Sequence, residues 1–167
     1  MTVSVLDRFV GTAIFATAIG AGLAAGSFFV FSSMVMPGLA RLAPAHGVAA
    51  MQALNVAAIS RVFLGVFLGT AVASLALAVA AVLQWSQPDA RLRLLAGLAY
   101  AIGCFGVTIA ANVPRNDALA ALAPDSAEAL AMWPRYLAQW TAYNHLRTVA
   151  ATLSCALYIG ALLLRAS

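Results

Sequence analysis

The chain has 167 residues, of which 64% are hydrophobic and only 8% are charged, and its mean hydropathy is +0.97. A soluble domain of this size leaves about a third of its surface wet and carries roughly a quarter charged residues, so an ordinary soluble fold is excluded. The net charge of +4 comes from nine arginines without any lysine, a surplus too thin and scattered for a nucleic-acid surface. The composition predicts an all-α integral membrane protein whose remaining solvent is lipid.

The first apolar run, residues 9–36, follows Arg8 and is too long for the core of a cleavable signal peptide. We interpret it as a retained membrane span that Pro37 and Gly38 are expected to stop. Residues 41–60 then form an amphipathic connection, because polar side chains interrupt the apolar ones.

Three further apolar runs reach the roughly 20 residues that a helix needs to cross the hydrocarbon core. The predicted spans are residues 62–85, 92–112 and 136–164. Pro114 breaks or restarts the helix after the third run, and residues 114–132 form a second polar, partly helical connection. We therefore predict one domain over residues 1–167, a four-transmembrane-helix antiparallel bundle.

Four spans place both termini on one side of the bilayer and both long connections on the other. The arginines near the span ends divide equally between the two sides, so the positive-inside rule does not choose an orientation. The acids Asp117, Asp125 and Glu128 lie on the long-connection side. Their placement favours cytoplasmic termini in the cell (inner) membrane.

Two glycine pairs have the spacing at which membrane helices approach closely: Gly22 with Gly26, and Gly65 with Gly69. They predict helix contacts and offer surfaces for a homo-oligomer. Cys104 and Cys155 each lie inside an apolar stretch, where cysteine acts as a small buried apolar residue. No Cys/His cluster with metal-ligand spacing occurs, so no metal site is predicted.

Polar and aromatic residues gather near the two long connections, while the opposite end of the predicted bundle looks short and plain. Trp133, Trp140, Asn144 and Arg147 are separated by seven, four and three residues, so they share one helical face. The remaining members of this group are Gln52, Asn55, Arg61, Asn112, Asn116, Asp117, Tyr136, Tyr143 and His145.

Three interpretations of these side chains stay open. The aromatic residues and Arg147 could form an interfacial belt with the arginine reaching the headgroups. The amides could form a structural hydrogen-bond network between helices. They could instead line a pocket, because ionisable groups two turns into a span, such as His145 and Arg147, usually face a cavity or a partner. His46 lies in a loop beside Pro44 and is expected to be exposed.

Four segments carry a resemblance to a known family. They are Gly26-Ser-Phe-Phe-Val-Phe-Ser-Ser-Met-Val-Met-Pro37, Met51-Gln-Ala-Leu-Asn55, Asn112-Val-Pro-Arg-Asn-Asp117 and Trp140-Thr-Ala-Tyr-Asn-His-Leu-Arg147. Together they resemble the DUF1772 (anthrone oxygenase-like) family of small four-span membrane proteins. The resemblance implies a cofactor-independent oxygenase that converts the methylene of an anthrone to a carbonyl with dioxygen. More generally, it implies a protein that oxidises or binds a flat aromatic or quinol-type small molecule in a pocket between the helices.

Under this resemblance the polar residues take roles. His145 is the base by side-chain type, since imidazole exchanges protons near neutral pH. Asn112, Asn116 and Asn144 donate hydrogen bonds to developing oxyanions, and Arg147 holds an anionic oxygen. The remaining candidates bind the substrate, the aromatic ones by stacking: Gln52, Asn55, Trp133, Tyr136, Trp140 and Tyr143.

Two alternatives belong to other classes of function. The first is a membrane redox protein that binds haem or quinone, with His145 as a single axial haem ligand. One well-placed histidine excludes a three-histidine metal site within one chain. The second is a binding or structural membrane subunit in which the amides are internal hydrogen-bonding groups.

Overall fold

The computed structural model describes residues 5–166, and within that range it contains helices and no strand. The first span is built from α1 (Val5–Val30), η1 (Phe31–Val35) and α2 (Met36–Leu39), and α3 (Pro44–Ala57) follows it. The second span is α4 (Arg61–Leu83). The third contains α5 (Ala90–Leu98), η2 (Ala99–Gly106), η3 (Thr108–Asn112) and α6 (Val113–Ala120), and α7 (Ala127–Ala166) is the fourth.

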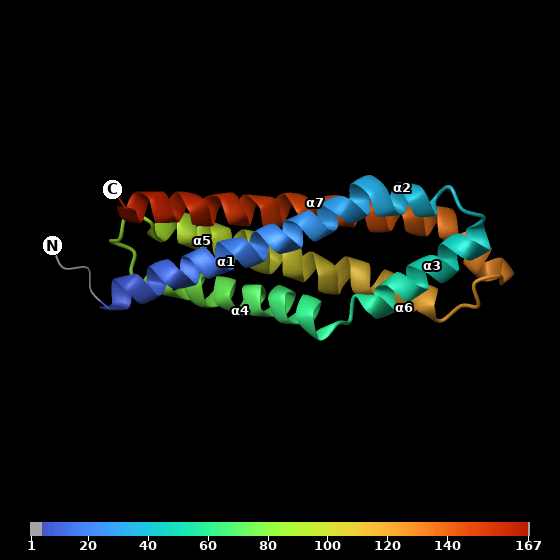
Figure 1. The fold of residues 1–167 in the computed structure, drawn as a ribbon, viewed down its shortest axis with the longest axis horizontal. Helices are drawn as coiled ribbons and strands as arrows, with labels where there is room; N and C mark the ends of the chain where they lie inside the picture. Colours follow the sequence, from blue (N-terminus) through green and yellow to red (C-terminus); the bar gives the residue numbers. More distant parts are fainter. Residues whose placement is uncertain (1–4, 167) are drawn as a thin grey trace.

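Among residues 5–166, four continuous helices are long and apolar enough to cross a bilayer: Asp7–Leu39, Arg61–Leu83, Ala90–Ala120 and Ala127–Arg165. The beginning of α1 and the end of α7 lie at one end of an elongated bundle, and α2, α3 and α6 lie at the other (Figure 1). Large apolar side chains such as Val72, Val79 and Leu163 are exposed on the outside of these helices, where acyl chains would surround them. The chain is an all-α integral membrane protein with a four-helix bundle, as the composition and the apolar runs predict.

Pro37 does not stop the first helix, contrary to the sequence prediction. The reason is the π-helical segment η1 before it, in which the Met36 N–H donates to the Phe31 carbonyl, five residues back. Pro37 then occupies the first turn of α2, where a missing N–H is tolerated. Pro114 follows η3 in the same way at the start of α6, so that helix also continues, to Ala120.

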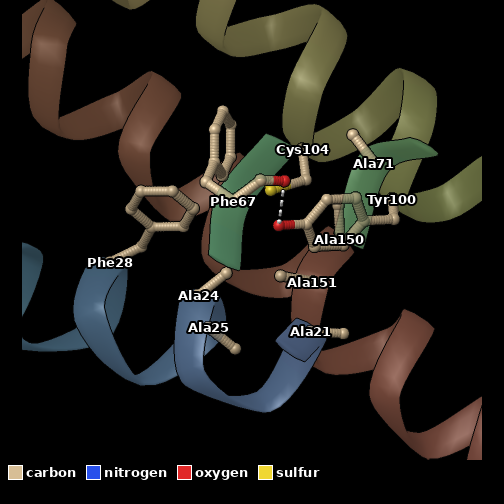
Figure 2. Close-up of a cluster of buried hydrophobic side chains, with 10 residues drawn as sticks. All are labelled: Ala21, Ala24, Ala25, Phe28, Phe67, Ala71, Tyr100, Cys104, Ala150 and Ala151. Carbon is tan, nitrogen blue, oxygen red and sulfur yellow. Dashed lines mark hydrogen bonds between the residues drawn. The ribbon is translucent and has the colours of Figure 1, made fainter. Parts of the chain in front are cut away.

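The middle of the bundle is filled by small residues around a few aromatic rings. Figure 2 shows Phe28 of α1 beside Phe67 of α4, with alanines of α1 and α7 below them and Tyr100 donating to the Phe67 carbonyl. The Phe28 and Phe67 ring centroids are 6.0 Å apart and meet edge to face. Because alanine occupies so many inward positions, the helices approach closely and leave room for only a few large side chains.

Glycine permits the closest approach of α4 to α5. A Cβ atom at Gly97 would lie 2.5 Å from the Ser74 carbonyl oxygen and 2.7 Å from the Ala78 Cβ. The predicted glycine pairs behave differently, because a Cβ at Gly26, Gly65 or Gly69 would meet nothing within 4 Å. Those three glycines are therefore not helix contacts within the chain, and the sequence prediction for them was wrong.

Gly97→Ala is expected to lower the free energy of unfolding by about 1–3 kcal/mol, because α4 and α5 must move apart to admit the methyl group. Gly26→Ala is the matched control, and it should leave stability unchanged or raised since its methyl group enters open space. Thermal unfolding in one detergent compares the two variants. Equal midpoints for Gly97→Ala and the unmodified chain would contradict the packing described here.

The sequence suggested that the end of the bundle where α1 begins and α7 ends has few polar residues, and this prediction was wrong. The side chains of Asp89 and Arg93 are fully buried there, with Asp89 Oδ2 2.9 Å from Arg93 Nε and 2.9 Å from Arg165 Nη1. Arg165 also reaches Asp7 Oδ1 at 3.2 Å, and Arg93 Nη1 donates to the Gln84 side chain at 3.0 Å. This ionic cluster joins the ends of all four spans.

Candidate functional site

A buried arginine lies in the half of the bundle opposite the ionic cluster. Arg147 of α7 is only 5% exposed, and its guanidinium carbon lies 4.2 Å from the centroid of the Phe28 ring and 5.2 Å from that of Trp140. The positive charge is therefore held between two aromatic rings from α1 and α7. Such a cation–π arrangement offsets part of the cost of removing the charge from water.

Neutral groups supply the hydrogen bonds of Arg147. Nη2 donates to Asn144 Oδ1 at 2.6 Å and Nη1 donates to Thr108 Oγ1 at 3.3 Å, while Nε has no hydrogen-bond partner. Among residues 5–166, the ion pairs all lie in the cluster at the opposite end of the bundle, so no carboxylate compensates this arginine. A buried cation with an unused donor is costly, and it is the feature expected of a site that receives an anion.

Asn144 fixes the position of this arginine. Its Nδ2 donates to the Phe28 carbonyl oxygen and to Ser32 Oγ, both at 2.6 Å, and its Oδ1 accepts from Arg147. The asparagine is fully buried and ties α7 to α1 beside the π-helical segment η1. Since both ends of the amide are engaged within the protein, Asn144 positions Arg147 and is not itself available to a ligand.

Asn116 of α6 is oriented by two donors. Its Oδ1 accepts from the Tyr136 hydroxyl at 2.9 Å and from Trp140 Nε1 at 2.8 Å. Only the carbonyl end of the amide can accept these two bonds, so its NH₂ group is directed away from Tyr136 and Trp140. Asn116 lines the cavity described next, and its NH₂ is the group left to serve a ligand.

A cavity of about 320 Å³, here called the chamber, lies in front of Arg147. Its walls come from α1, the junction of α3 and α4, α6 and α7, and its lining residues are Ser27, Phe28, Phe31, Leu54, Asn55, Ala57, Ala58, Phe63, Asn116, Trp140 and Arg147. Asn55 Nδ2 is buried without a hydrogen-bond partner. Among the described residues, no carboxylate or imidazole lines the chamber. Its walls are aromatic and aliphatic, and its charged and amide groups offer donors.

A second pocket of about 430 Å³ adjoins the chamber and shares Asn55, Phe63 and Asn116 with it. Gln52 and the exposed Asp117 line this second pocket. Gln52 Nε2 donates to the Leu119 and Leu122 carbonyls, each at 2.9 Å. Gln52 therefore binds the end of α6 to α3, and its amide nitrogen has no bond left for a ligand.

The structure brings together a part of the predicted site. Trp133, Trp140, Asn144 and Arg147 are all buried on one face of α7, as their spacing predicts. Asn55, Asn116, Trp140 and Arg147 line the chamber, while Tyr136, Asn144 and Asn112 form hydrogen bonds with residues that line it. Asn112 is 1% exposed and donates to the Trp140 carbonyl at 3.2 Å.

Three predicted residues lie elsewhere. Trp133 stacks on Tyr136 with ring centroids 5.6 Å apart and belongs to the apolar core under α3. Tyr143 is 37% exposed, and the Arg115 guanidinium lies 4.4 Å from its ring centroid. His145 is exposed and lines neither the chamber nor the second pocket.

The outward direction of His145 follows from helix geometry. Each residue turns about 100° around the axis, so the residue after an inward-facing Asn144 leaves the face that Arg147 and Trp140 share. The prediction that His145 meets the amides in one chamber was therefore wrong. His46 is exposed, as expected, but it lies in the first turn of α3 and not in a loop as the sequence predicted.

Several residues at the site carried no clear signal in the sequence. Ser32 and Thr108 supply hydroxyl groups to Asn144 and Arg147, yet Ser32 is one of two adjacent serines and Thr108 a single threonine in otherwise apolar runs. Phe28, Phe31 and Phe63 form most of the aromatic wall and look like ordinary span residues. The π-helical segments η1 and η3 are of a kind that is frequent at functional sites, but the prolines that follow them indicate only a helix break in the sequence.

Comparison with known proteins relates the chain to a family. A family model described as anthrone oxygenase matches residues 60–157, more than half of the chain. The match includes Asn112–Asp117 and Trp140–Arg147 and begins after the two earlier segments quoted above. No curated protein and no solved structure shows a significant match.

Proposed function

The chain belongs to the anthrone oxygenase family, and from this premise we propose that the chamber binds the anion of a flat hydroxyaromatic compound and exposes it to dioxygen. One observation carries the proposal: Arg147 is a buried cation without a carboxylate partner, placed between two aromatic rings at the wall of a 320 Å³ cavity. That volume lies within the range of small-molecule sites.

The reaction that fits these groups is the oxidation of a methylene that lies between two aromatic rings and is conjugated through them with a ketone. Loss of a proton gives an anion whose charge is spread onto oxygen, where the Arg147 guanidinium and the Asn116 NH₂ group stabilise it. The carbon then forms a bond to dioxygen. Cleavage of the O–O bond leaves one oxygen atom as a carbonyl and the other, with the two methylene hydrogens, as water. The methylene loses four electrons and dioxygen gains them.

His145 has no part in this proposal. Binding the anion next to Arg147 favours ionisation by itself, so a base inside the chamber is not required, and the proton passes to water. The electrons come from the substrate, so the proposed reaction needs no cofactor. A haem bound by His145 would lie on the outer surface of α7, whereas a quinone or quinol could occupy the chamber as a related flat ligand. With cytoplasmic termini in the cell membrane, the chamber would lie in the outer leaflet.

Purified protein in lipid nanodiscs, supplied with anthrone near neutral pH, is expected to consume one dioxygen for each quinone formed. An oxygen electrode and quinone absorbance measure this together, and heat-inactivated protein corrects for spontaneous oxidation. His145→Ala should keep the rate within about twofold of the unmodified chain, because the side chain faces away from the chamber. No rate above background would refute the oxygenase, and a folded but inactive His145→Ala would restore the histidine as base.

A further inference from the structure

The chamber continues into a furrow along the outside of α1 and α4. The chamber shares Ser27 and Phe63 with a pocket of about 220 Å³. That pocket in turn shares Leu23 and Val66 with another pocket of about 310 Å³. These two further pockets are called the furrow. In Figure 1, α1 crosses from the α4 side at the termini to the α7 side at α2, so α1 and α4 diverge toward the chamber.

Missing side chains create much of the furrow. Gly65 and Gly69 of α4 line it, and a Cβ at either position would meet nothing within 4 Å. At Gly97, in contrast, the neighbouring helix occupies the space that a side chain would need. The glycines of α4 therefore leave a groove open to lipid, and no other helix of residues 5–166 fills it.

The dimensions of the furrow suit an extended hydrocarbon chain. Its α1 side runs from Ser27 to Ala16, a stretch of twelve residues separated by eleven helical steps. This corresponds to a rise of about 16 Å, roughly the length of a dozen methylene groups. Its other lining residues include Ala24 and Ala73, so the floor is mostly small and apolar.

Resting on the function proposed above, we propose that the ligand is an amphiphile: a hydroxyaromatic head in the chamber with a linear hydrocarbon tail in the furrow. The observation that links the two is Arg147, which is 95% buried on the chamber wall with Nε unpartnered, at the chamber end of this continuous path. An anionic head pairs with that guanidinium, and the tail leaves along α1 and α4. The ligand then enters sideways from the leaflet.

The test uses 1-naphthol and naphthols with four-, eight- and twelve-carbon chains, titrated calorimetrically into the detergent-solubilised chain. Each affinity is corrected for partition into empty micelles. The unmodified chain is expected to bind the dodecyl compound at least about tenfold more tightly than 1-naphthol, because additional apolar surface is buried. Gly69→Leu fills the furrow and should remove most of that gain without weakening 1-naphthol. Ala156→Leu, which adds the same side chain on the exposed face of α7, should keep the gain.

The outcomes separate the two proposals. A chain-length gain that survives in Gly69→Leu, or is absent in the unmodified chain while 1-naphthol still binds, overturns the furrow and leaves the chamber intact. If dodecanoate and dodecyl-naphthol both bind more tightly than 1-naphthol by the same factor, and Gly69→Leu removes that increase in affinity, the result supports the furrow and overturns the hydroxyaromatic head. Tight dimerisation that Gly69→Leu abolishes would assign the furrow to a second copy of the chain and overturn the tail.

Discussion

Arg147→Gln is expected to lower the rate of anthrone oxidation by about 100-fold, the effect of removing one strong donor from a developing oxyanion. The glutamine can still reach neighbouring polar groups but carries no charge. The ionised ligand would then lie in an apolar cavity with only the amides to stabilise it. Oxygen consumption and quinone formation in nanodiscs measure the loss.

The thermal midpoint distinguishes a functional arginine from a structural one. A buried cation without a carboxylate partner costs free energy in the empty protein, so Arg147→Gln should leave the midpoint unchanged or raise it. A large fall in stability together with the loss of activity would indicate that Arg147 mainly holds the fold.

Arg115→Gln is the matched control. Arg115 lies on α6, where it donates to the Ala111 carbonyl at 2.7 Å and lies over Tyr143, and it lines neither the chamber nor the second pocket. The same change of side chain should therefore keep the rate close to that of the unmodified chain. Equal losses in both variants would assign the effect to net charge and contradict a specific role for Arg147.

Asp89→Asn is expected to destabilise the bundle by about 3 kcal/mol or more, because removing one partner leaves a buried charge uncompensated. Asp89 Oδ2 contacts both Arg93 and Arg165, and the Arg93 side chain is fully buried. Arg93 would keep its bond to Gln84, but no carboxylate among residues 5–166 would pair with it. Unfolding in mixed SDS micelles, followed by circular dichroism, measures the change.

Two further variants test this account of the ionic cluster. Asp125→Asn changes the same side chain at an exposed position and should shift the midpoint little. Asp89→Asn combined with Arg93→Met removes both fully buried charges and should recover part of the lost stability. A double variant that is less stable than Asp89→Asn alone would show that Arg93 has a role beyond pairing with Asp89.

The membrane class, the four spans and the inward face of α7 could be predicted because each depends on local properties. A run of about 20 apolar residues is enough to cross lipid, and residues three, four and seven apart share a helical face in any helix. The spacing of Trp140, Asn144 and Arg147 therefore identified buried neighbours without any knowledge of other helices. The same rotation of about 100° per residue turns His145 away from that face, so its exposure was open to prediction as well, and the prediction was wrong because it weighed the side-chain type above the position.

The tertiary structure decided which polar groups meet. Asn144 bonds to the Phe28 carbonyl 116 residues away, and Arg165 reaches Asp7 across 158 residues. No sequence pattern encodes such pairs, since they depend on how far each helix extends and how it is rotated and tilted. In the sequence, Pro37 indicates only the end of a helix. In the structure, the shifted hydrogen bonds of η1 accommodate the proline and the helix continues. Apolar length thus determined that the chain spans a membrane, whereas helix packing determined that an unpaired arginine lies against a cavity.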